Sequence, residues 1–182
     1  AYYRNRTDIA HPDIDLKNLA ISKEEQKWAD DAMDHTFFVH KGYQPSYNYG
    51  KDINWEYWPV KDNELRWQLH RHKWFTPMGK AYRISGDEKY AKEWAFQYID
   101  WIKKNPLVKM EKENFELVSA GEVKEDADNV HFAWRQLEVS NRLQDQTCQF
   151  LLFCPAEAFT PEFLTEFLVN YHRHGAYLFK NY

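Results

Sequence analysis

The stretch DEKYAKEWAFQYIDWIKKNP (residues 87–106) decides the fold class of this chain. Asp87 can cap a helix because its side-chain oxygen accepts from the first helical amides. Asn105-Pro106 can end the helix because proline disfavours helical geometry in the residue before it. Between these signals, apolar residues recur every three or four positions, as on one face of an α-helix. That stripe consists of Ala91, Trp94, Ala95, Tyr98 and Ile102. The sequence therefore predicts a helix over 87–104.

The same periodicity extends over most of the chain. Ser22 with Glu25 three residues later is the capping-box arrangement and predicts a helix near 22–39. Thr160 followed by Pro161 is typical of another helix start. The further helices are predicted near 63–84, with a kink or division at Pro77, near 131–153 and near 161–181.

No segment shows convincing strand alternation, so the predicted fold class is all-α. Long antiparallel helices joined alternately by short and long links, including 108–129, indicate a helical bundle or part of an α/α barrel or toroid. A length of 182 residues fits one domain or part of a larger one. Because the last predicted helix runs into Asn181-Tyr182 without a stop signal, we expect a truncated domain.

Composition excludes several classes of protein. The net charge of −4 argues against a general nucleic-acid binder, which carries a basic surface. The longest apolar run, 150–154, is far shorter than the roughly 20 residues that cross a bilayer, so no membrane span is predicted. Cys148 and Cys154 lie on and at the end of one predicted helix, where a disulfide would require unwinding. We expect two buried thiols.

Arg71 falls on the same arc of its predicted helix as Trp67, Phe75, Met78 and Tyr82. A guanidinium among aromatic rings must be paired, stacked or placed along a cleft, because burying it alone is costly. Two interpretations stay open at this point. The arginine is structural and bound to carbonyls or a carboxylate, or it faces a groove and binds an anion.

Arg135, Glu138, Arg142 and Asp145 follow one another at spacings of three, four and three residues. On a helix they form a single stripe of alternating charge. A solvated ion ladder is one interpretation, with each pair worth only a few tenths of a kcal/mol. The other places the stripe on an inner helix that faces a cavity, because apolar residues flank it on both sides. Glu138 would then hold the two arginines in place and would not act as an acid.

His70 and His72 would point roughly 200° apart on a helix and could not chelate one metal ion. The same holds for His172 and His174. No metal site is predicted, and a hydrogen-bonded structural role is favoured for His70.

The loop at 41–59 is rich in Tyr, Trp and Asn. It is either a sugar platform, with flat rings on carbohydrate faces, or a packing plug. Asn54 and Trp55 are its candidates for sugar binding. The sequence contains no nucleophile elbow, phosphate-binding glycine loop or zinc-protease motif, so the residues alone define no complete active site.

Long strings of this sequence resemble the amino-terminal α-domain of the heparinase II/III-type polysaccharide lyases, and in particular its heparinase III (heparan-sulfate lyase) branch. The strings are NELRWQLHRHKWFTPMGKAYRISGDEKYAKEW (63–94), DWIKKNP (100–106), FAWRQLEVSNRLQDQ (132–146), YGKDINWEYWPVKDNE (49–64) and FTPEFLTEFLVNYHRH (159–174). Together they cover nearly the whole chain.

The resemblance implies that residues 1–182 are the amino-terminal part of an incomplete α/α toroid, with the rest of the toroid and a β-sandwich domain absent from this chain. It implies cleavage of an acidic glycosaminoglycan by β-elimination at hexuronic acid. The Asn, Tyr and His that this branch uses come after residue 182, so no catalytic residue is carried over. Arg135 matches a position where related lyases place a substrate-contacting arginine. Gln136 departs from an expected Pro, which a helix turn tolerates.

The expected substrate-binding residues are Arg135, Trp134, Glu138, Arg142, Arg71, His70, Asn54 and Trp55. The expected partner is heparan sulfate or heparin, with no nucleic acid. No cofactor is expected in this segment, and any structural divalent metal is expected in the absent part. The intact protein is expected to be a periplasmic or secreted bacterial monomer, and this chain alone to be inactive. Two other functions stay open: a non-catalytic glycan-binding helical domain, and a helical scaffold without a ligand.

Overall fold

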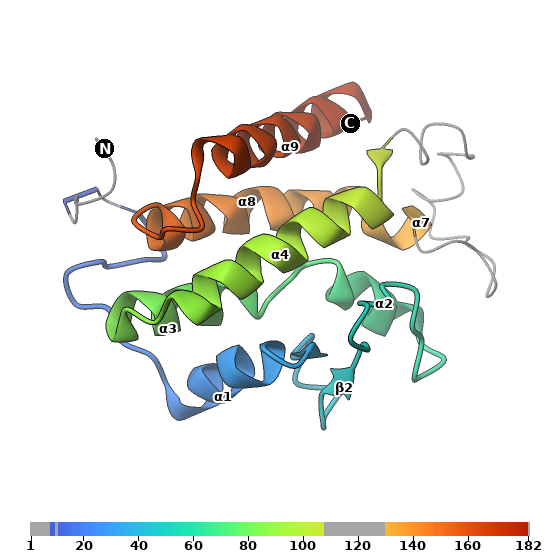
Figure 1. Cartoon of the computed structure of the whole chain (residues 1–182). Helices are drawn as coiled ribbons and strands as arrows, with labels where there is room; N and C mark the ends of the chain where they lie inside the picture. The colour runs from blue at the N-terminus through green and yellow to red at the C-terminus, as the bar shows by residue number, and fades with distance from the viewer. Residues whose placement is uncertain (1–7, 10, 108–129, 182) are drawn as a thin grey trace.

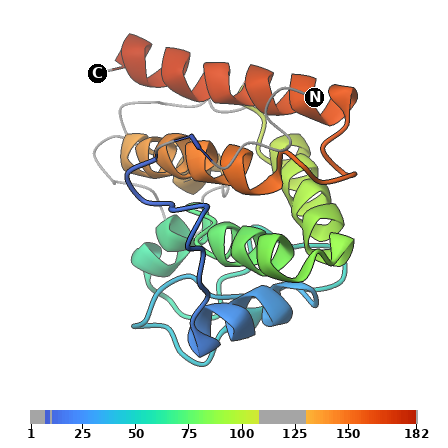
Figure 2. The same ribbon diagram turned by 90° about the vertical axis from the view of Figure 1, so that its left-hand side faces the viewer.

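A computed structural model describes residues 8–9, 11–107 and 130–181 of the protein. Helices α9, α8, α3 and α1 are stacked in this order, and α4 packs against α3 and α9 (Figures 1 and 2). The elements are α1 (Lys23–Ala32), β1 (Thr36–Phe37), β2 (Tyr47–Asn48), α2 (Asn63–Leu69), α3 (Phe75–Ser85), α4 (Glu88–Lys104), α7 (Val130–Ala133), α8 (Gln136–Phe153) and α9 (Pro161–Asn181). The predicted all-α class is confirmed, apart from one small antiparallel sheet that pairs β1 with β2.

Helix α4 and helix α9 occupy the ranges predicted for them. Asp87 caps α4 by accepting from the amide of Lys89 at 3.0 Å. Gly86 ends α3 with a φ of 72°, a left-handed conformation that glycine adopts without strain. The antiparallel α3–α4 hairpin therefore turns within Gly86-Asp87 (Figure 1). Helix α9 returns antiparallel along α8 (Figure 2).

Helix α1 begins where predicted and ends seven residues early. Ser22 and Glu25 form the complete capping box. The predicted extension to residue 39 is wrong, because the chain turns at His35, whose φ is 58°. This turn brings Phe37 into the core, where its ring stacks on Trp74 at a centroid distance of 4.0 Å. Burial of this aromatic pair favours the turn over further helix.

Two predicted helices are each broken once. The range 63–84 divides into α2 and α3 at residues 70–74, where His72 has a φ of 54°. Pro77 causes no break, contrary to prediction, because it lies in the first turn of α3 where no helical amide is required. The range 131–153 divides into α7 and α8 at Trp134 and Arg135.

Tryptophan side chains form much of the core, and each buried indole N–H has an acceptor. The donor–acceptor pairs are Trp55–Asp100, Trp74–Gln97, Trp94–Gln149, Trp101–His70 and Trp134–Asn105. A buried Trp buries much apolar area but needs a partner for its polar end. The high aromatic content of the sequence is thus accounted for by packing inside the helical stack.

Cys148 and Cys154 are both free and buried, as predicted. Among the described residues, no helix combines the length and apolar character needed to cross a bilayer. The predicted long connection over 108–129 lies outside the described residues.

Candidate functional site

One buried carboxylate lies between two guanidinium groups. Glu138, in the first turn of α8, is fully buried. Its Oε1 lies 2.9 Å from Nη2 of Arg71 and 3.5 Å from Nη1 of Arg135. Arg71 comes from the break after α2, so residues 67 positions apart in the sequence meet here. We call Arg71, Glu138 and Arg135 the Arg71–Glu138 cluster.

The cluster keeps its cations partly open to solvent. The side chains of Arg71 and Arg135 are 13% and 25% exposed, whereas that of Glu138 is 0% exposed. The guanidinium of Arg135 lies 4.0 Å from the centroid of the Trp67 ring, a cation–π contact that fixes its plane. Glu138 was predicted to hold Arg135 and Arg142. It does pair with Arg135, but its second ion pair is with Arg71, and Arg142 bonds to His174 and the His70 carbonyl instead.

Arg71 also lies along a groove of about 560 Å³ between α1, α3 and α8. Lys41 and Lys73 line the same groove. Lys73 Nζ is held 2.9 Å from Asp145 Oδ2, whereas Lys41 is exposed. Two carboxylates, Glu25 and Asp145, line it as well and are held by Lys80 and Lys73. The cations that an acidic ligand would meet in this groove are therefore Arg71 and Lys41. We call it the Arg71 groove.

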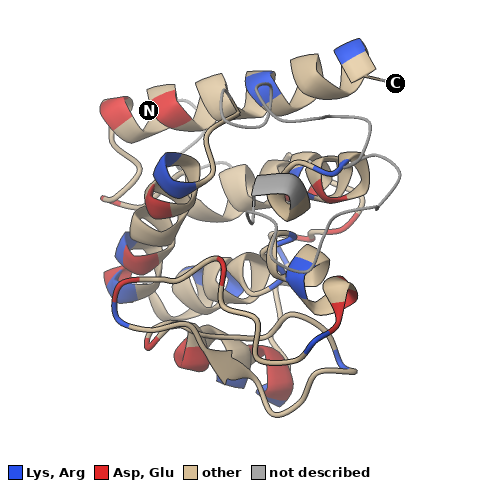
Figure 3. Cartoon of the chain, turned by 90° about the vertical axis from the view of Figure 1, so that its right-hand side faces the viewer, with Lys and Arg blue, Asp and Glu red and all other residues tan. Residues whose placement is uncertain are grey.

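Trp28 and Phe38 form an apolar part of the Arg71 groove. Their rings stack with centroids 3.7 Å apart and planes 11° apart. Cations beside an aromatic surface suit an anionic sugar, since the cations pair with its acidic groups and the rings cover its apolar face. On the side of the molecule in Figure 3, Lys and Arg are interspersed with Asp and Glu, so recognition of an anion depends on a local site of this kind.

Arg142 does not face a groove, contrary to prediction. Its side chain is enclosed in the core, 1% exposed, with the Trp101 and Trp134 ring centroids 4.4 Å and 5.5 Å from its guanidinium. Nε donates to Nε2 of His174 at 2.8 Å, and Nη1 donates to the backbone oxygen of His70 at 2.9 Å. Burial lowers the pKa of the guanidinium to about 9. Arg142 is a structural arginine.

The predicted site residues His70 and Trp134 are also enclosed. His70 is 0% exposed, and its Nδ1 accepts from the indole N–H of Trp101 at 3.1 Å, which confirms the hydrogen-bonded structural role. Trp134 is 1% exposed and donates to the backbone oxygen of Asn105 at 2.9 Å. The break in the chain at Trp134 turns this side chain inward, where it lines a hollow of about 340 Å³ with Asn170 and Arg173.

Of the two roles proposed for the aromatic loop, Trp55 takes that of a packing plug. Trp55 is 2% exposed, stacks on Phe37 and donates to Asp100 Oδ2 at 2.8 Å, so this ring is a packing plug. Asn54 is exposed, but its Oδ1 accepts from the amide of Glu56 at 2.9 Å. The hollow beside Asn54 is lined by Asp52 and Glu56 and also by Lys104, whose Nζ is held 2.6 Å from Asp52 Oδ1, so its charge is mixed.

Of the predicted residues, the structure therefore brings together Arg71, Glu138 and Arg135 at a partly open position. Sequence reasoning missed Lys41 and Lys73. The signal for Lys73 was present, because it ends the basic run His70-Arg71-His72-Lys73. Lys41 carries no comparable signal.

Comparison with known proteins gives consistent matches along the whole chain. A heparin-sulfate lyase from Bacteroides stercoris is 70% identical over 97% of this chain, and the match covers 27% of that protein. A heparin-sulfate lyase from Pedobacter heparinus is 46% identical over 100% of this chain and is matched over 26% of its own length. This chain thus spans about a quarter of the length of these relatives.

Solved structures give the same result. A heparinase III structure superimposes with a TM-score of 0.86 at 75% identity, over 100% of this chain and 28% of that one. A heparan sulfate lyase structure from Pedobacter heparinus gives a TM-score of 0.80 at 45% identity, over 100% of this chain and 27% of that one. The model of the heparinase II/III N-terminus matches residues 1–182, and the chain therefore belongs to the heparinase II/III family, as part of its amino-terminal region.

Proposed function

We propose that this chain is the amino-terminal segment of a lyase that cleaves heparan sulfate or heparin by β-elimination at hexuronic acid. The Arg71 groove carries the proposal for the role of this segment, because it places Arg71 and Lys41 beside an aromatic wall. The relatives named heparin-sulfate lyases support the reaction.

The proposed role of the segment is to bind and orient the polymer. Arginine suits this role because its planar fork can bind a carboxylate or a sulfate through two hydrogen bonds. Glu138 and Glu64 hold Arg71 Nη2 at 2.9 Å and 3.6 Å, and the side chain is 13% exposed where it lines the groove. Orientation of this kind lowers the barrier because the reacting bond is held near the catalytic groups.

Proton transfer is assigned to residues beyond this chain. β-Elimination requires neutralisation of the uronate carboxylate, removal of the C5 proton and protonation of the leaving oxygen. In the proposed enzyme an Asn, a Tyr and a His after residue 182 perform these steps. This chain alone would then bind the polymer without cleaving it.

The same relatives support a proposal for the architecture, oligomeric state, location and cofactors of the whole protein. The chain would form the first part of an incomplete α/α toroid, followed by the rest of the toroid and a β-sandwich domain. The protein would act as a monomer in the periplasm or outside a bacterial cell. No cofactor would take part in the chemistry of this segment, and a structural divalent metal would lie in the later part. Support comes from the bacterial origin and greater length of the relatives.

The experiment measures cleavage of heparan sulfate by the protein that carries this chain, through the ultraviolet absorbance of the unsaturated uronate product. The groove variants are Arg71→Ala and Lys41→Ala, and Lys103→Ala is the matched control on the exposed end of α4. Because charge-assisted contacts are lost, KM should rise by about tenfold for Arg71→Ala, with a smaller rise for Lys41→Ala. Lys103→Ala should keep the wild-type KM.

The outcomes distinguish the proposed lyase activity of the protein from the proposed polymer-binding role of the Arg71 groove. No product from the wild-type protein would refute the lyase, and retention on immobilised heparan sulfate without product would identify a non-catalytic glycan-binding domain. Cleavage with identical KM for all three variants would refute the role of the Arg71 groove. Lys41 is exposed, so its removal tests the groove without disturbing the core.

A further inference from the structure

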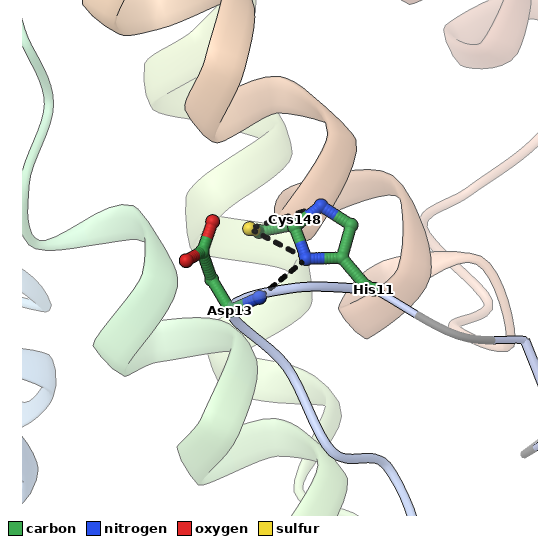
Figure 4. Close-up of side chains that lie close together, drawn as sticks. All are labelled: His11, Asp13 and Cys148. Carbon is green, nitrogen blue, oxygen red and sulfur yellow. Dashed lines mark hydrogen bonds between the residues drawn. The ribbon is translucent and has the colours of Figure 1, made fainter.

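Three side chains of different chemistry meet where the segment before α1 crosses α8. They are His11 and Asp13 on the segment and Cys148 on α8 (Figure 4). One donor atom from each, an imidazole nitrogen, a carboxylate oxygen and the thiol sulfur, lies within 4.8 Å of the others. Cys148 is buried, His11 is half-buried and Asp13 is exposed, so the cluster opens to solvent on the Asp13 side.

The distances within the cluster match those between ligands of one ion. Cys148 Sγ lies 3.7 Å from Nδ1 and 3.6 Å from Nε2 of His11. A tetrahedral zinc ion with Zn–S of about 2.3 Å and Zn–N of about 2.0 Å separates these two ligand atoms by roughly 3.5 Å. The separation suits two ligands of one ion, but the sulfur is nearly equidistant from the two nitrogens, so the imidazole would have to turn until one nitrogen points at the ion.

Neighbouring groups already hold the imidazole. His11 Nε2 lies 2.9 Å from Thr147 Oγ1, and the Thr147 hydroxyl donates to the backbone oxygen of Gln144 at 2.7 Å. His11 Nδ1 accepts from the amide of Asp13 at 3.1 Å, so its lone pair points toward the Asp13 backbone. Zinc-binding histidines commonly donate their second ring N–H to an oxygen acceptor in this way. A metal ion at Nδ1 would take the place of the Asp13 amide.

A nucleophilic role for Cys148 is disfavoured. Its thiol is buried, and a carboxylate oxygen of Asp13 lies within 4.8 Å of the sulfur. Reactive cysteines have a lowered pKa in positively charged surroundings. A soft sulfur, an imidazole and a carboxylate in one small space instead form the donor set of zinc.

We propose that His11, Asp13 and Cys148 bind a zinc ion that ties the segment before α1 to α8. Water would occupy the fourth position, on the exposed Asp13 side. This site lies on residues that the sequence pattern did not single out as ligands, and it does not depend on the proposed lyase activity. Its role is structural, because it joins two parts of the chain 137 residues apart.

Cobalt substitution tests this proposal through a direct thiolate signal. The protein that carries this chain is stripped of metal with a chelator and titrated with Co²⁺, and the bound ion is then displaced with Zn²⁺. A cobalt–thiolate bond gives charge-transfer absorption in the near ultraviolet, and tetrahedral Co²⁺ gives visible bands. Both signals should appear at one equivalent, disappear on zinc addition, and be lost in Cys148→Ser. Cys154→Ser is the matched control, since it removes the other buried thiol of this chain.

His11→Gln and Asp13→Asn should weaken Co²⁺ binding by about tenfold or more. Asp13 is exposed, so its variant keeps the test valid if Cys148→Ser does not fold. Three results would overturn the proposal: no thiolate absorption in the wild type, the same absorption in Cys148→Ser, or wild-type affinity in both His11→Gln and Asp13→Asn.

Discussion

Arg142 donates from Nε to Nε2 of His174 across 2.8 Å inside the core. The acceptor role of Nε2 places the His174 proton on Nδ1, which lies 2.7 Å from the backbone oxygen of Asn170. Burial, with the nearby Arg142 charge, lowers the pKa of His174 well below its ordinary value. A protonated His174 would break this contact, so the core requires the neutral imidazole.

This relationship sets one part of the pH dependence of stability. In the folded state His174 takes up a second proton less readily than in the unfolded chain. Its contribution to the free energy of unfolding is therefore complete above the unfolded pKa of about 6.5, and it is lost as the pH falls toward the folded pKa. His174→Gln should reduce the slope of unfolding free energy against pH by up to about 1.4 kcal/mol per pH unit in that range. Urea denaturation at a series of pH values measures the slope. An unchanged slope would mean that His174 does not titrate on unfolding.

His35 should have the opposite effect. Its hydrogen bond to Glu93, at 3.0 Å, raises the pKa of His35, and Nδ1 is held 2.7 Å from the backbone oxygen of Gly50. A raised folded pKa gives stability that is complete below about pH 6.5 and is lost as pH rises through the folded value. Glu93→Gln should therefore reduce the free energy of unfolding most at low pH and least above neutrality. An equal loss of unfolding free energy at every pH in the same denaturation series would contradict this role of the His35–Glu93 pair.

Arg142→Lys should destabilise the protein although the charge is kept. Lysine cannot reproduce the two donors to His174 and His70 or the stacking between indole rings. With hydrogen bonds to charged groups worth about 1.5–3 kcal/mol each, we expect a loss of about 3 kcal/mol in unfolding free energy. Arg173→Lys, on the exposed side of α9, should change stability little. Equal melting temperatures for the two variants would contradict the structural role of Arg142.

Gly79 marks the closest approach of α3 to α8. A Cβ atom placed there would lie 2.8 Å from Leu152 Cβ and 3.1 Å from Phe153 Cε2. Gly79→Ala should cost about 1–3 kcal/mol through overpacking. Gly175→Ala is the control in α9, where a Cβ meets nothing within 4 Å, and it should gain roughly 0.5–1 kcal/mol. Thermal unfolding of both variants checks the sign, and a stabilising Gly79→Ala would show that the helices can move apart at little cost.

The sequence predicts a helix well where the signals are local. Helices α4 and α9 carry their own starts, Asp87 and Thr160-Pro161, and both have the predicted ranges. The breaks after α2 and before α8 carry no glycine or proline. They arise from contacts made by His70 and Trp134 with distant residues, which periodicity in one segment cannot reveal.

In the candidate site, as in the fold, the sequence predicted contacts between residues close in the chain and missed those between distant residues. The three-residue spacing of Arg135 and Glu138 correctly placed these side chains together. The expectation that the stripe faces a groove was wrong for Arg142, because the face of α8 that carries Glu138 and Arg142 packs into the core, where Arg142 meets His174 and the His70 carbonyl. His11 and Cys148 are 137 residues apart, so only the packing of the segment before α1 on α8 brings them together.

The contact of Arg142 with the His70 carbonyl has a consequence for the local opening of α2. Helix α2 has only seven residues, too few to persist alone in water. Its start is capped locally by Asp62 and its last carbonyls accept from the amides of residues 70–72, but the carbonyl of His70, directly after it, accepts from Arg142 of α8, 72 residues away. The end of α2 is therefore tied to α8 in the folded protein. Its amides should exchange with solvent hydrogen together with those around Arg142, in one cooperative unit.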